Sequence, residues 1–168
     1  MNGQLMDLFS EGDMRTVKNV DKVLILLTQN PSLLADAVEF MMSDEKIIAM
    51  RAADCVEKFS RIHPELCQPY TQKFMNLLEA TSQQEVQWHL ALILPQLDLS
   101  SADIQRALPV WEENFYHHSS SIVRTASLQA IRDVAKRNTD AAKLFETMLP
   151  YAIEHGTPAM QARARHFI

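Results

Sequence analysis

A helical pattern of apolar residues recurs along the chain about every 37 residues. Five segments align when their first residues are spaced 36, 38, 37 and 37 apart; these first residues are Asp13, Ala49, Gln87, Arg124 and Gln161. Small or apolar residues follow three and seven positions later in all five segments, and also four and ten positions later in the first four. These offsets fall on one face of an α-helix. The spacing therefore predicts a stack of similar helical units.

A second set of helices alternates with the first, at residues 31–42, 64–78, 101–116 and 140–153. Phe74, Trp111 and Met148 are each 37 residues apart, so this set shares the same repeat. Helix starts are marked by prolines suited to a first turn and by residues that favour N-caps: Pro31, Pro64, Ser100 or Ser101, and Thr139 or Asp140. We therefore expect one all-α domain over residues 1–168, with about nine or ten helices in antiparallel pairs and about four and a half helix-pair repeats.

One segment, from Val123-Arg124 to Val134, resembles a HEAT repeat. The segments "MRAADCVEKFSRIHPELCQPY", "QQEVQWHLALILPQLDL" and "SSIVRTASLQAI" are also similar to a group of small uncharacterised bacterial HEAT-like proteins. The resemblance implies a HEAT-like (armadillo-like) α-solenoid, a right-handed α-α superhelix in which the second helix of each repeat lines the concave surface. HEAT repeats usually carry arginine at the start of this segment, and here only Arg124 does so.

Composition limits the class of protein. Hydrophobic residues make up 47% of the 168 positions and charged residues 22%, which is typical of a globular protein. A net charge of −5 speaks against an electrostatically driven nucleic-acid binder. The apolar run at residues 23–27 is far too short to cross a membrane, and residues 1–9 lack the features of a secretory signal. With only two cysteines, the sequence favours a cytoplasmic protein with free thiols.

Residues suited to catalysis or metal binding are present but do not form a motif. Adjacent residues such as His117 and His118 point about 100° apart on a helix, so we expect this pair to cap a helix end rather than to bind a metal. Cys55 belongs to a buried helix face, and its twelve-residue separation from Cys67 matches no metal or redox motif. We therefore predict no enzyme activity, no catalytic residue, no cofactor and no metal.

The solvent side of the repeated helices carries an unusual set of side chains. One position after the start lie Met14, Met50 and Trp88, and two positions after it lie Arg15, Arg51, His89 and Arg163. One interpretation is a concave partner-binding stripe, accessible and contiguous across repeats, with an apolar centre and a cationic rim. The alternative is that the apolar members pack between helices and the arginines pair with neighbouring carboxylates.

These features favour a non-enzymatic adaptor or scaffold that holds a protein or peptide partner on its concave face. An alternative is DNA binding or repair, because some alkylpurine DNA glycosylases resemble HEAT solenoids and grip DNA with basic and aromatic side chains. In that hypothesis Trp88, Trp111 and the arginines of the stripe contact DNA, although the net charge of −5 speaks against nucleic acid as the partner. A third alternative is a role in cofactor attachment, as in HEAT-like bilin lyases.

The last segment predicts how the chain ends. Four apolar residues form one face of a terminal helix that we expect to be mostly buried: Met160, Ala164, Phe167 and Ile168. A half repeat at the end of a stack leaves an edge, so the sequence predicts a monomer or weak self-association.

Overall fold

The structure, a computed structural model, describes residues 3–11 and 19–168. Its helices in chain order are α1 (Gly3–Ser10), α2 (Val20–Gln29), the 3-10 helix η1 (Pro31–Leu33), α3 (Leu34–Phe40), α4 (Lys46–Ile62), α5 (Pro64–Cys67), η2 (Gln68–Tyr70), α6 (Thr71–Ala80), α7 (Gln84–Ile93), η3 (Leu94–Gln96), α8 (Ser101–His117), α9 (Ser121–Ala135), α10 (Thr139–His155) and α11 (Pro158–Arg165). Within these ranges there is no β-strand, so the prediction of an all-α protein is confirmed. In the same part of the chain, no helix is both long enough and apolar enough to span a membrane.

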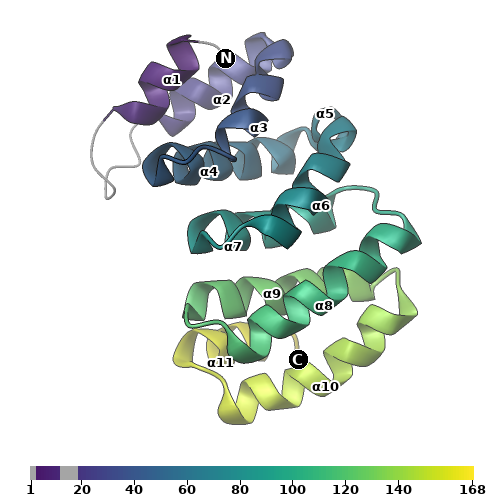
Figure 1. Ribbon diagram of the computed structural model, residues 1–168. Coiled ribbons are helices and arrows are strands. Elements are labelled where there is room, and N and C mark those ends of the chain that lie inside the picture. Colours follow the sequence, from purple (N-terminus) through teal and green to yellow (C-terminus); the bar gives the residue numbers. More distant parts are fainter. Residues whose placement is uncertain (1–2, 12–18) are drawn as a thin grey trace.

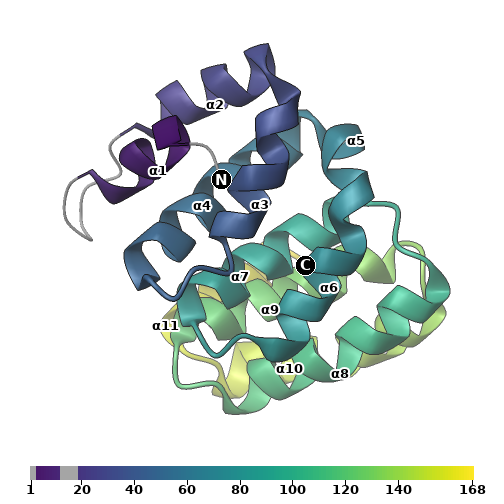
Figure 2. The same ribbon diagram turned by 45° about the horizontal axis from the view of Figure 1, so that its top comes forward.

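The helices form two layers (Figure 1). We call α4, α7, α9 and α11 the α4 layer, and α3, α6, α8 and α10 the α8 layer. In the α4 layer each helix packs against the next. Helices that follow one another in sequence pack across the layers, as α3 does on α4, α8 on α9 and α10 on α11. In Figures 1 and 2 the chain accordingly proceeds in order from the N-terminal end (purple) to the C-terminal end (yellow).

The repeated apolar positions form the core between the layers. Nine of them, from α4 to the end of α9, are at most 1% exposed: Ala52, Val56, Phe59, Leu90, Leu94, Leu97, Leu128, Ile131 and Val134. The equivalent residues of the α8 layer, Phe74, Trp111 and Met148, are fully buried. In the first copy, Asp13, Thr16 and Val17 lie outside the described residues, whereas Val20 and Val23 of α2 are buried. The sequence periodicity therefore places most of the core correctly.

The helix starts agree with the sequence with one exception. Pro31 and Pro64 occupy the first positions of η1 and α5. Ser100 caps α8 in a reciprocal arrangement with Asp103, whose backbone N–H donates to the Ser100 hydroxyl. The predicted caps Thr139 and Asp140 are wrong, because the Asn138 side chain accepts the backbone N–H of Ala141 and caps α10 instead.

The apolar face of α11 is buried only in part. Met160 and Ala164 of α11 are fully buried, and Phe167 packs edge-on against Phe145 of α10 with 5.7 Å between ring centroids. The expectation that Ile168 belongs to this buried face is wrong, since its side chain is 87% exposed. The reason is that α11 ends at Arg165, so the helical spacing no longer applies to the last residues.

Candidate partner-binding surface

Two residues of the predicted stripe, Met14 and Arg15, lie outside the described residues. A third, Arg51, is 6% exposed, so the expectation that it is accessible is wrong. Its Nη1 donates hydrogen bonds of 2.7 Å to the carbonyl oxygens of Phe9 and Glu11 at the end of α1. A guanidinium at a helix C-terminus satisfies carbonyls that have no partner within the helix. Arg51 therefore attaches α1 to α4.

His89 is also buried, with 1% exposure, which contradicts its expected position on the surface. Its Nε2 lies 4.0 Å from Oδ1 of Asp54 on α4, and the indole ring of Trp88 covers it with 3.4 Å between ring centroids. No residue of the described chain forms a hydrogen bond with its Nδ1. Burial, and to a smaller extent the positive charges of Lys58 and Arg61, lower the pKa of His89 to about 3. His89 is therefore a neutral side chain between two helices.

Both corrections have one physical cause. A helix in the middle of a layer is covered by its partner across the layers and by the layer neighbours before and after it. Residues that lie two positions after the start of a repeated segment point toward the preceding unit. Arg51 thus points toward α1, and His89 points toward α4. Only a narrow strip of each helix remains open to solvent.

Met50 and Trp88, which lie one position after the start of their segments, are both half-buried and line different hollows. Met50 is half-buried and lines a polar hollow of about 380 Å³ together with Lys46, Gln84 and His118. Trp88 lines a different hollow, formed with residues of α9 and α11. Met50 and Trp88 thus line separate hollows, and a continuous stripe between them stays a prediction.

The second hollow is an apolar groove across three consecutive helices of the α4 layer. We call it the α7–α9–α11 groove; it has a volume of about 240 Å³ and is lined by Trp88, Leu92, Ile122, Thr125, Ala126, Gln129, Ala159 and Arg163. Trp88 is half-buried and Ile122 is 59% exposed, so both present apolar surface to solvent. Two predicted residues, Trp88 and Arg163, thus meet in one site.

Sequence reasoning missed most of the other residues of this groove. Ile122 and Ala159 lie two positions before the start of their repeated segments. Leu92 and Gln129 lie five positions after the start of theirs. Together with the position one after the start, these offsets form a second helical face. The missed groove residues could have been found by including, in each repeated segment, the positions one helical turn before and one helical turn after the position of Trp88.

The charges near the groove are distributed unevenly. Several other cations in or next to the α4 layer pair with carboxylates: Lys58 with Asp54, Arg61 with Glu57, and both Arg132 and Lys136 with Asp133. Arg163 is exposed at the rim of the groove and has no such pair among the residues that the structure describes. Among the described residues, no carboxylate lines the groove, and the guanidinium of Arg163 is the only formal charge in its lining.

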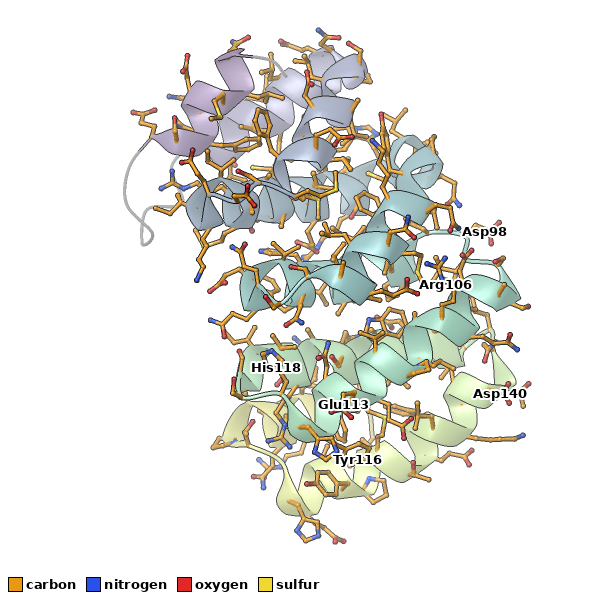
Figure 3. All side chains as sticks on the ribbon, in the orientation of Figure 1. Asp98, Arg106, Glu113, Tyr116, His118 and Asp140 are labelled. Atoms are coloured by element: carbon orange, nitrogen blue, oxygen red, sulfur yellow. The ribbon has the colours of Figure 1, made fainter. Side chains whose placement is uncertain are left out.

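The α8 layer uses its polar side chains for structure. Arg106 of α8 points toward α6 (Figure 3), where its guanidinium binds both carboxylate oxygens of Glu79 at 2.9 and 2.8 Å. The same guanidinium also donates to Gln72 and Asn76 of α6. This network joins two successive units.

The surroundings of His118, Cys55 and Cys67 indicate structural roles for these residues. His118 follows α8, and its Nδ1 accepts the backbone N–H of Ser120 at 2.9 Å, so it contacts the start of α9 rather than terminal carbonyls of α8 (Figure 3). Cys55 and Cys67 are buried, and burial raises the pKa of each thiol to about 12. Within the described ranges, no three histidine, cysteine, aspartate or glutamate residues are placed to hold a metal ion.

Comparison with known proteins gives no relative: no protein-family model, curated protein sequence or solved structure matches the chain.

Proposed function

We propose that this chain is a non-enzymatic interaction module, a HEAT-like right-handed α-solenoid that holds a protein partner against its α4 layer. The observation that carries the proposal is the α7–α9–α11 groove, in which Trp88 and Ile122 present apolar surface that no part of the described chain covers. Aromatic and aliphatic side chains that remain accessible in a hollow are typical of sites where a partner anchors.

The packing of the two layers supports a concave α4 layer. Neighbouring helices of the α4 layer all pack extensively on one another. In the α8 layer α6 and α8 do so, whereas α3 with α6 and α8 with α10 make less extensive contact. A stack whose helices approach more closely in one layer curves toward that layer, and repeat proteins commonly bind partners on such a surface.

The DNA-binding alternative has less support. Of the residues that it requires, Trp111 is fully buried and Arg51 is 6% exposed and bonded to α1. Two cationic arginines of the stripe, Arg51 and Arg163, belong to the described residues, and of these Arg163 is the exposed one. A single exposed cation supplies little of the phosphate neutralisation that drives DNA binding.

The experiment compares two exposed isoleucines. Ile122 lines the groove and is 59% exposed, whereas Ile62 at the end of α4 is 62% exposed and does not line it. Aspartate at either position is solvated and costs little folding stability, whereas aspartate at position 122 also places a charge in the apolar contact. The wild-type chain, Ile122→Asp and Ile62→Asp are used as baits in extracts of the native cell.

We expect proteins that are captured by the wild-type chain and by Ile62→Asp to be lost with Ile122→Asp. Capture of the same proteins by all three baits contradicts the proposal. Circular dichroism and thermal melting of each bait check that the variants remain folded.

A further inference from the structure

We propose that the segment bound in the α7–α9–α11 groove is an acidic peptide, which places an apolar side chain on Trp88 and Ile122 and a carboxylate on Arg163. This inference rests on the proposed function, because it names the partner chemistry of the same groove.

The walls of the groove select the apolar part of the ligand. Trp88 and Leu92 of α7 face Ile122 and Ala126 of α9 across a hollow of about 240 Å³. Pockets for small molecules are usually larger, roughly 300–1,000 Å³, and more enclosed. The size and lining of this groove therefore fit the side chain of a peptide, with aliphatic or aromatic character.

Arg163 selects the charged part. Its guanidinium is the only charged group among the described residues that line the groove, whereas Lys58, Arg61 and Arg132 are neutralised by carboxylates of their own or neighbouring turns. A guanidinium presents parallel N–H donors that match the two oxygens of a carboxylate. A cationic ligand placed here would meet Arg163 without any compensating carboxylate from the lining. Charge complementarity thus favours an acidic segment.

The two contacts constrain the spacing in the peptide. Ile122 lines the groove from α9, and Arg163 lines it from α11, the next helix of the layer. One short segment therefore reaches both, and its carboxylate is within a few residues of its apolar side chain. The carboxylate is supplied either by an acidic side chain or by the C-terminus of the peptide.

The first stage of the test is selection of binders from a displayed random-peptide library on the purified full-length chain. We expect selected sequences to combine an aliphatic or aromatic residue with a nearby aspartate, glutamate or free C-terminus. Synthetic versions are then made with the acid, with the matching amide in its place, and with a blocked C-terminus.

Trp88 provides the readout, because a ligand in the groove changes the environment of its indole whereas Trp111 is fully buried in the core. We expect Arg163→Gln to weaken binding of the acidic peptide about tenfold, the effect of losing one charge-assisted hydrogen bond, and to leave the amide peptide unchanged. Arg165→Gln is the matched control, since Arg165 is exposed on the same helix but does not line the groove. It should bind both peptides as the wild-type chain does.

The outcomes separate this inference from the proposed function. If selected peptides lose binding with Ile122→Asp but lack an acid, or bind Arg163→Gln as tightly as the wild-type chain, the groove is a peptide site and the acidic preference is wrong. If no selected peptide depends on Ile122, both the acidic preference and the groove as the binding site are wrong.

Discussion

The imidazole ring of His89 lies where solvent does not reach it and where its Nδ1 meets no hydrogen-bond donor or acceptor of the described chain. A charged imidazolium in this position would be desolvated and would repel Lys58 and Arg61. The folded chain therefore keeps His89 neutral, and this has a consequence for stability.

Stability should fall as the solution becomes acidic. The pKa of His89 is about 3 in the folded state, whereas an exposed histidine of the unfolded chain has a pKa of about 6.5. Between these values the unfolded state binds more protons, so the free energy of unfolding decreases by up to about 1.4 kcal/mol for each pH unit below about 6.5. The stabilising contribution of neutral His89 is fully present above a pH of about 6.5. Urea denaturation at a series of pH values measures it.

Two variants isolate the effect of His89. His89→Gln removes the titrating group, so its stability should depend less on pH, whereas His117→Gln alters an exposed histidine and should behave as the wild-type chain does. Burial raises the pKa of Glu57, which acts in the opposite direction, and the comparison between variants removes this contribution. An identical pH dependence in His89→Gln and the wild-type chain would show that the imidazole is accessible to protons in the folded state.

Arg51 leads to a second prediction at the residue scale. Arg51→Met keeps an unbranched apolar side chain but removes the donors to Phe9 and Glu11, so α1 should detach from α4. We expect a loss of about 1–3 kcal/mol in the free energy of unfolding. Hydrogen exchange should show faster exchange in α1 and unchanged exchange in α9. Arg165→Met is the control, and unchanged protection of α1 would contradict the attachment.

At the scale of helices, the sequence periodicity predicts which face of a helix packs against the partner layer. It does not predict which residues pack against neighbouring helices of the same layer. Val56, Leu94 and Ile131 are buried as predicted, because each lies in the centre of the repeated apolar face. The burial of His89 depends instead on α4, whose residues lie 27 to 43 positions earlier in the chain and whose distance from α7 no local pattern encodes. The groove was predicted in part, through Trp88 and Arg163, since exposed positions repeat with the same spacing as buried ones.

Gly156 tests how α11 is held. A Cβ atom at this position would lie 2.2 Å from the backbone oxygen of Ala152 and 3.0 Å from Cβ of Met160. Gly156→Ala should therefore displace α11 and lower the free energy of unfolding by about 1–3 kcal/mol, as overpacking does. In Gly3→Ala, by contrast, the added Cβ meets no atom within 4 Å. Chemical denaturation compares the two, and equal stability would mean that the turn before α11 adapts without cost.

For the whole molecule, exposed apolar surface beside α11 predicts association. Ile168 is 87% exposed next to the half-buried Phe167, and contact with a second copy of the chain would cover this surface. We expect a monomer that associates weakly as its concentration rises, and less so in Ile168→Ser. Light scattering measures the average mass, and a strict monomer at high concentration would contradict this.

The central claim is that a protein partner occupies the α7–α9–α11 groove in the cell. Photo-crosslinking tests it most directly, with benzoylphenylalanine replacing Ile122 in one variant and Ile62 in the other. Both positions are exposed to a similar degree, so illumination gives each an equal chance to react with passing proteins. The account predicts a discrete crosslinked partner from position 122 and none from position 62. The same adduct from both positions, or none from position 122, would contradict it.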